Sequence, residues 1–267
     1  MRMKNKIFSF ENFRQKDLFV FDLDGTLIET KSPMDSEMLG LIAKLLEVKK
    51  VAVIGGGKYG VFQELFLRRL KCRKELLKNL FLFPATSTTF YKYNHGWKKI
   101  YSLSLSPAEI TKTKKAFQDV FKEIGYKHPK KTYGKIIENR KTQVAFSVYG
   151  QDLVKKLGAK GVKMKKEWLR DNLPTKMKIA KLVAKRLSDL EVRAAGFTTI
   201  DVTKRGIDKA YGIGQIKKYL KIPVSKMFFI GDAIFPGGND YAVVRTGVNY
   251  KSVSNLNETK NIIRKIL

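Results

Sequence analysis

The stretch FVFDLDGTL at residues 19–27 constrains the fold of this chain more than any other. Residues 18–21 form a short apolar run typical of a buried strand, and Gly25 permits a sharp turn after it. Asp22 and Asp24 therefore leave the carboxyl end of the strand, where open α/β sheets bind ligands. The pattern predicts that Asp22 is a nucleophile and Asp24 a general acid and base. An ordinary Asp-Gly turn between a strand and a helix is the alternative.

The charge balance is unusual. The 267 residues include 54 Lys and Arg against 24 Asp and Glu, which gives a formal net charge of +30. Basic residues occur in nearly every segment, so most of them are expected to form a solvated surface, and a basic cleft would attract phosphorylated metabolites. The positive charge also permits nucleic-acid binding. This is the lesser alternative, because the sequence has no zinc-finger spacing, RNP-like strand or basic heptad pattern.

The rest of the composition favours a globular protein of the cytoplasm. Hydrophobic residues make up 43% of the chain, yet no apolar run approaches the roughly 18 residues of a membrane span. Residues 1–16 are basic and lack the apolar segment of a secretory signal. Cys72 is the single cysteine, which excludes an internal disulfide and favours a reducing compartment. A homodimer is compatible with the sequence.

Two further buried strands are predicted at residues 51–54 and 80–83, and an amphipathic helix precedes the first of them. This helix is expected to begin at Ser32 as its N-cap, with Pro33 and Asp35 in its first turn.

A glycine-rich turn follows the strand at residues 51–54. Gly55, Gly56 and Gly57 stand between that strand and a segment of helical spacing. Backbone N–H groups in such a turn can hold a phosphate, although an ordinary tight turn has the same composition.

Residues 86–203 are predicted to be an α+β insertion, because a hairpin pattern with a turn at residues 94–96 replaces the α/β texture there. A capping box at Ser106 opens a helix that ends at Gly125. The other elements expected in the insertion are strands at residues 135–139 and 143–148, a helix at 174–190, and strands at 191–194 and 198–202.

The α/β pattern returns after Gly206 with a helix at residues 209–220, a strand at 227–230 and a terminal helix. The strand ends at Asp232, and Asn239 and Asp240 follow in a glycine-rich loop. We therefore expect an α/β fold with a Rossmann-like doubly wound core and an inserted α+β cap. The core would comprise residues 1–85 and 204–267, and the cap residues 86–203.

In chain order, Asp22 and Asp24, the glycine turn, Lys209 and Asp232 resemble the four motifs of the haloacid dehalogenase superfamily. The resemblance implies that Asp22, Asp232 and the backbone carbonyl of Asp24 bind Mg²⁺. It also implies that Lys209 neutralises the reacting anions, since a carboxylate must approach an anionic phosphate. An ordinary surface lysine is the alternative for Lys209.

Members similar to phosphomannomutases share further segments with this chain. These are residues 199–202 with 206–209, residues 231–232 with 236–240, and residues 138–140 with 147–151. The resemblance implies that Arg140 holds the distal phosphate of the substrate. The other substrate-binding residues that it implies are Gly55, Gly56, Gly57, Gln151, Thr199, Asp201, Asn239 and Asp240.

Two positions depart from that family. Gln151 stands where an arginine is expected, and an amide has neither the charge nor the fork of a guanidinium group. Residues 55–57 also lack the hydroxyl that the second motif normally offers, so backbone N–H groups or a water must serve.

The resemblance implies a Mg²⁺-dependent phosphotransferase that acts on small sugar phosphates through a phospho-aspartate at Asp22. Interconversion of mannose 6-phosphate and mannose 1-phosphate is the first expectation. A sugar-phosphate phosphatase would use the same residues and differ only in the group that accepts the phosphoryl. A catalytically silent nucleic-acid-binding scaffold is the third alternative, and the intact Asp22, Asp24, Lys209 and Asp232 argue against it.

Overall fold

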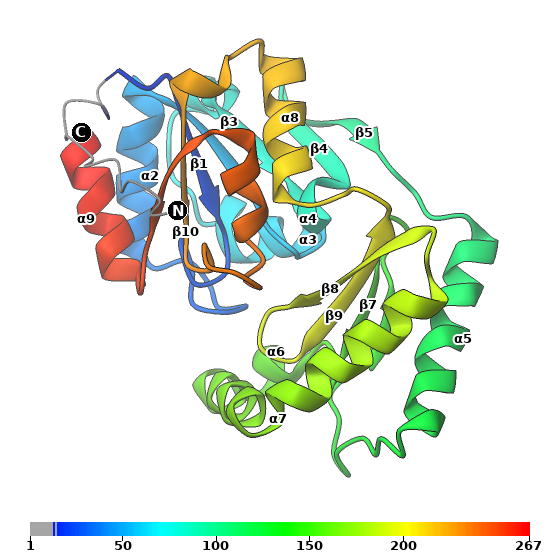
Figure 1. Cartoon of the computed structure of the whole chain (residues 1–267). Coiled ribbons are helices and arrows are strands. Elements are labelled where there is room, and N and C mark those ends of the chain that lie inside the picture. Colours follow the sequence, from blue (N-terminus) through cyan, green and yellow to red (C-terminus); the bar gives the residue numbers. More distant parts are fainter. Residues whose placement is uncertain (1–12, 14) are drawn as a thin grey trace, which may run out of the picture.

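The computed structural model describes residue 13 and residues 15–267, which form two sheets with their helices (Figure 1). The larger sheet has seven strands in the order β11-β10-β1-β2-β3-β4-β5. Its strands are β1 (Leu18–Asp22), β2 (Lys50–Ile54), β3 (Leu80–Phe83), β4 (Thr89–Tyr93), β5 (Trp97–Ser102), β10 (Met227–Gly231) and β11 (Asn249–Ser252). The five strands from β11 to β3 are parallel, and β4 and β5 are antiparallel.

Helices cover both faces of the larger sheet. Phe19 and Phe21 of β1 belong to the hydrophobic cluster that includes α2 (Ser36–Val48) and α9 (Leu256–Ile266). Leu18 and Val20 belong instead to the cluster that includes α8 (Lys209–Leu220). Because alternate side chains of a strand point to opposite faces, β1 is buried from both sides. The expected α/β class with a doubly wound, Rossmann-like core is confirmed.

Short segments connect these elements. They are α3 (Tyr59–Phe62), the π-helix η1 (Gln63–Leu67), the 3-10 helices η2 (Lys74–Asn79), η3 (Val224–Lys226) and η4 (Tyr241–Thr246), and α4 (Pro84–Ser87). No helix among residues 15–267 is both long enough and apolar enough to cross a membrane.

Helix α2 begins at Ser36, so the start expected at Ser32 is wrong. Asp35 is the N-cap, and its carboxylate accepts a hydrogen bond from the backbone N–H of Met38 at 2.9 Å. Lys260 of α9 also lies 3.0 Å from this carboxylate. Both Ser32 and Asp35 are residue types that favour the N-cap position. The structure uses Asp35, which also contacts α9.

The hairpin of β4 and β5 lies in the larger sheet, whereas the sequence interpretation assigned it to the insertion. β4 pairs with β3, and the rings of Phe83 and Phe90 stack at 4.5 Å between centroids. Phe90 also lies 5.5 Å from Tyr219 of α8. The aromatic composition that looked like a new domain instead extends the core sheet by two antiparallel strands.

The smaller sheet has the order β6-β7-β9-β8. Its strands are β6 (Ile137–Asn139), β7 (Val144–Ser147), β8 (Leu190–Ala195) and β9 (Thr199–Lys204). Figure 1 shows α5 (Pro107–Glu123) and α7 (Ala159–Arg186) on the face of this sheet that points away from the core. Ile200 and Val202 of β9 are buried with those helices. Asp201 lies between them in the strand, so its side chain points to the opposite face, toward the core. The short α6 (Leu153–Leu157) precedes α7.

Helix α7 begins at Ala159, well before the start expected at Pro174. Pro174 lies inside the helix, and Asn172 has non-helical angles of φ −131° and ψ 19°. Proline lacks an N–H and its ring clashes with the carbonyl four residues earlier, so it bends this helix without ending it.

Candidate active site

The expected catalytic carboxylates meet where the topology of the larger sheet reverses. From β1 the chain proceeds to β2 on one side, whereas β10 pairs with β1 on the other. Asp22 ends β1, and Asp232 directly follows β10. In doubly wound sheets the crevice at such a reversal is the usual ligand site.

Lys209 is the cation of this site. Its Nζ lies 2.6 Å from Oδ1 of Asp22 and also contacts Oδ1 of Asp240. Lys209 is 2% exposed, and both carboxylates are buried as well. Asp208, the residue before Lys209, is the N-cap of α8. Its carboxylate accepts a hydrogen bond of 2.9 Å from the N–H of Tyr211 and pairs with Arg245. Lys209 is therefore the first residue of a capped helix, held by the core.

Charges around Lys209 are unbalanced. Burial would lower the pKa of Lys209, but Asp22 and Asp240 outweigh it and raise that pKa, so the amine is charged. Burial raises the pKa of Asp22 well above its usual value, opposed by Lys209 and assisted by Asp240 and Asp232. Burial and then Asp240 raise the pKa of Asp232 to about 6. The three carboxylates of Asp22, Asp232 and Asp240 surround one lysine, so the site has a net negative charge that a further cation could neutralise.

A divalent cation bound here would neutralise the excess negative charge of these carboxylates. Asp22, Asp232 and Asp240 each place a carboxylate oxygen within 4.8 Å of the others. Both oxygens of Asp240 already accept hydrogen bonds, from Lys209 and from the N–H of Ala233. Oδ2 of Asp22 is buried and has no hydrogen-bond partner within the described part of the chain. The oxygens best placed to bind Mg²⁺ are thus those of Asp22 and Asp232, since Mg²⁺ prefers oxygen ligands.

Asp24 lies beside this cluster, at the entrance of the turn after β1. Its Oδ1 accepts a hydrogen bond of 2.7 Å from the backbone N–H of Lys31. Gly25 has φ +88°, and a Cβ atom there would come within 2.4 Å of Oδ2 of Asp232. Glycine is therefore required for the turn and for the close approach of Asp232.

The glycine turn is fastened to α4. The carbonyl groups of Gly55 and Gly57 accept hydrogen bonds from the N–H groups of Thr86 at 2.9 Å and Ala85 at 2.8 Å. Residues 85–87 have φ between +50° and +68°, so α4 is a left-handed turn built without glycine. Within residues 15–267, the N–H groups of Gly56 and Gly57 donate no hydrogen bond. The turn can offer them to an anion.

Arg140 joins the smaller sheet to the glycine turn. Its Nη1 donates to the carbonyl of Gly56 at 3.1 Å, and its Nη2 donates to Oε1 of Gln151 at 2.9 Å. Its Nε lies 2.6 Å from Glu138. Gln151 also accepts from Nζ of Lys31 at 3.4 Å and donates to the carbonyl of Ala145. The amide thus holds two cations in place.

Three other expected residues lie in different settings. Asp201 is 7% exposed and faces the glycine turn, because a Cβ atom on Gly56 would lie 3.7 Å from its Oδ2. Thr199 uses its hydroxyl locally, in a 2.5 Å hydrogen bond to the carbonyl of Ala195. Asn239 is partly buried in the loop after β10.

Sequence reasoning missed three lysines near this site, Lys31, Lys165 and Lys176. Lys165 and Lys176 lie on α7 and are only 3% and 5% exposed. The signal that could have found them is position: Lys176 precedes Ile179 and Ala180 by one helical turn, on the stripe that faces the sheet.

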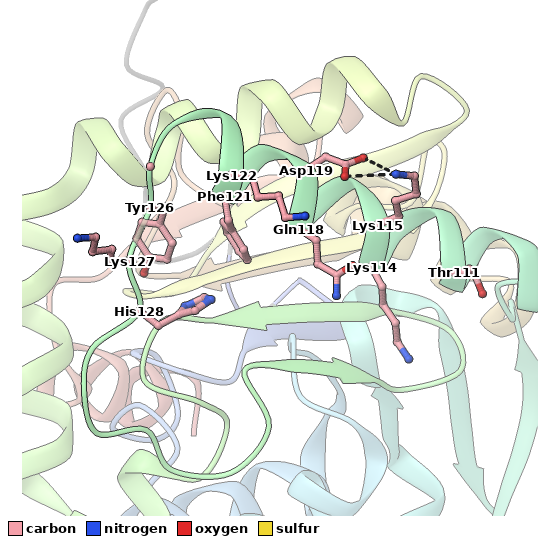
Figure 2. A pocket seen from close by; sticks show the side chains of 11 residues that line it. Thr111, Lys114, Lys115, Gln118, Asp119, Phe121, Lys122, Tyr126, Lys127 and His128 are labelled. Carbon is pink, nitrogen blue, oxygen red and sulfur yellow. Dashed lines mark hydrogen bonds and ion pairs between the residues drawn. The ribbon is translucent and has the colours of Figure 1, made fainter.

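Figure 2 shows the side chains that line a different hollow, beside α5. Its volume is about 1080 Å³. Phe121, Tyr126 and His128 are among the residues that line it, with ring centroids about 5 Å apart. None of the expected catalytic residues lines it.

Comparison with known proteins agrees with the fold. A family of haloacid dehalogenase-like hydrolases matches residues 19–244. The match covers most of the chain, and the chain belongs to this family.

The chain is also similar in sequence to curated phosphomannomutases. The chain is 26% identical to a phosphomannomutase of Encephalitozoon cuniculi over 243 residues, which cover 90% of this chain and 87% of that protein. It is 24% identical to human phosphomannomutase 1 over 237 residues, with 86% and 84% covered. Among solved structures, an IMP-nucleotidase of Plasmodium falciparum superposes with a TM-score of 0.69 at 18% identity, covering 96% of this chain and 72% of that one. That likeness concerns the fold.

Proposed function

We propose that this protein is a Mg²⁺-dependent phosphotransferase for hexose phosphates, most similar in activity to a phosphomannomutase. The observation that carries the proposal is the contact of Arg140 with Gly56. It brings a cationic group of the cap to the glycine turn, which directly follows Ile54, the residue that pairs with Asp22 in the sheet. A substrate enclosed there would meet a nucleophile at one end and a cation from the cap at the other.

Asp22 attacks the phosphorus atom, and the bond from phosphorus to the sugar oxygen breaks as the new bond forms. Asp24 gives a proton to the leaving oxygen, which produces a free hydroxyl and a phospho-aspartate. In the second half Asp24 takes a proton from the incoming hydroxyl, whose oxygen then attacks the phosphoryl group. Lys209 neutralises Asp22 and the phosphate oxygens throughout.

Asp22 and Asp232, with the backbone carbonyl of Asp24, would hold Mg²⁺, which when bound polarises the phosphoryl group and reduces repulsion between the two anions. The group that accepts the phosphoryl from the phospho-aspartate decides whether the enzyme is a mutase or a phosphatase. A second sugar hydroxyl gives a mutase, and water gives a phosphatase. The phosphatase remains the second candidate because Gln151, which is neutral, stands where the family resemblance expects an arginine.

The test begins with Asp22→Asn, which keeps the volume of the side chain and removes the nucleophile. Turnover of p-nitrophenyl phosphate and of mannose 1-phosphate should vanish, whereas Asp17→Asn at the exposed opposite end of β1 should behave as the parent. Mass spectrometry of the parent after brief exposure to substrate should show one added phosphoryl group. Full activity of Asp22→Asn would refute the proposal.

Parallel rates of isomerisation and of phosphate release, with a hexose bisphosphate as activator, separate the two candidates. Isomerisation supports the mutase. Phosphate release without isomerisation replaces it with the phosphatase.

A further inference from the structure

Lys165 and Lys176 are buried on one face of α7. They are about three turns apart, a spacing that returns to the same face of a helix. Buried lysines are rare unless they are paired. Their burial therefore calls for a partner or a ligand.

Among the residues that the structure describes, neither lysine has an anionic partner in contact. Nζ of Lys176 donates to the carbonyl of Gly196 at 2.5 Å. Lys165 makes no hydrogen bond and no ion pair with any residue that the structure describes. The charges that act on it come from Lys31, Lys176 and Arg140, which repel it, and from Asp24, which attracts it. Lys165 thus points into the same region as Asp24 and Arg140.

Positive charge exceeds negative charge in this region. Glu138 neutralises Arg140 at 2.6 Å. Lys31 gives its ammonium hydrogens to the oxygens of Gln151, which are neutral. Asp201 attracts Lys31 and Lys176 as well as Arg140 and Arg193, and its Oδ1 has no hydrogen-bond partner within the described residues. Asp24 attracts Lys31 and Lys165. The cations around these two carboxylates therefore outnumber them.

Such an excess is unfavourable in the free protein. Removing a charge from water has a penalty of several kcal/mol when no opposite charge compensates it. The lysines respond accordingly: burial, with the repulsion of Lys31, lowers the pKa of Lys165 to about 7, and burial lowers the pKa of Lys176 to about 8. A dianion bound among them would remove the imbalance.

We propose that Lys165 and Lys176, together with Lys31, bind the second phosphate of the substrate, the one that is not being transferred. This inference rests on the proposed phosphotransferase function and adds residues of α7 to its substrate site. The three amines would provide the charge that Gln151 does not. A bisphosphorylated intermediate could then stay bound while its two phosphates exchange places.

The experiment measures equilibrium binding by calorimetry with EDTA present, so that no turnover occurs. The probes are a hexose 1,6-bisphosphate, a hexose monophosphate and inorganic phosphate. Lys165→Met and Lys176→Met remove the charge and keep the length of the apolar side chain. Lys163→Gln and Lys178→Gln are the controls, since both lysines are exposed on the same helix.

We expect each methionine variant to lower the affinity for the bisphosphate about tenfold or more, the effect of one lost charged hydrogen bond. The ratio of bisphosphate to monophosphate affinity should fall with it, and the controls should keep the ratio of the parent. Thermal unfolding without ligand should show Lys165→Met at least as stable as the parent, because an uncompensated buried charge is gone. A purely structural lysine would instead give a loss of stability.

Two outcomes overturn the inference. One is a ratio within twofold of the parent in both methionine variants. The other is an equal loss for bisphosphate, monophosphate and inorganic phosphate, which would place the lysines at the transferred phosphate. Because these measurements need no catalysis, they stay informative if Asp22→Asn shows that the proposed chemistry is wrong.

Discussion

Replacing Lys209 with methionine should leave two buried carboxylates without their cation. Lys209 is 2% exposed and lies between Asp22 and Asp240, which are themselves buried. Removing one partner of a buried ion pair typically lowers the free energy of unfolding by about 3–5 kcal/mol. For a chain of this size that corresponds to a melting temperature lower by roughly 6–20 °C. Lys217→Met, on an exposed part of the same helix, is the matched control.

The loss should depend on pH in a defined direction. The pKa of Asp22 is already raised above its unfolded value by burial, and the loss of Lys209 raises it further. A carboxyl group with a raised pKa destabilises the fold when it is ionised, so stability falls as pH rises through that pKa. Lys209→Met should therefore be most destabilised near pH 8 and should recover toward the parent near pH 5.

Thermal unfolding at both pH values, with EDTA present, measures this difference. The double variant Lys209→Met with Asp240→Asn should regain part of the lost stability, because one of the two orphaned charges is gone. Equal losses at pH 5 and pH 8, or a loss below about 1 kcal/mol, would refute the reasoning that Lys209 compensates buried charge.

Three further outcomes follow from the site. Asp24→Asn should lower turnover by about 10²- to 10⁴-fold, and an unchanged rate would assign the proton transfer to another group. Mg²⁺ at a hundred times its Kd should stabilise the protein by about 2.7 kcal/mol at pH 7.5. Below pH 6 its affinity should fall at least about tenfold per pH unit as Asp232 protonates, and calorimetry showing a flat profile would contradict that ligand. Arg140→Ala should damage bisphosphate turnover more than cleavage of p-nitrophenyl phosphate, and equal damage would argue against a role at the distal phosphate.

Strong local signals made much of the core predictable. Apolar runs located β1, β2, β3 and β10, and the carboxylates that follow β1 and β10 were expected at the edge where they lie. The capping box at Ser106 was also correct, with Glu109 accepting from the N-cap N–H. Each of these features depends on residues that are neighbours in sequence.

Features that depend on distant contacts were missed. Strand β11 (Asn249–Ser252) is polar and partly exposed at the edge of the sheet, so it has no apolar run to reveal it. The hairpin of β4 and β5 was misassigned because only its pairing with β3 shows which sheet it joins. Lys165 and Lys176 were missed for a different reason. Among 54 basic residues these two do not stand out by type, and the position of Lys176 on the apolar stripe of α7 is the signal that was overlooked.

The left-handed turn at residues 85–87 sets a limit on engineering this protein for heat resistance. Each non-glycine residue in that conformation is disfavoured by about 1–2 kcal/mol, so glycine there should raise the melting temperature at little steric expense. Yet the backbone N–H groups of Ala85 and Thr86 hold the carbonyl groups of Gly57 and Gly55, and the rigid turn thereby shapes the loop that we propose for phosphate binding. Glycine would keep these donors but would let the turn adopt other conformations. Selection for thermal tolerance alone would favour substitutions that loosen this support, and it should be paired with selection for turnover.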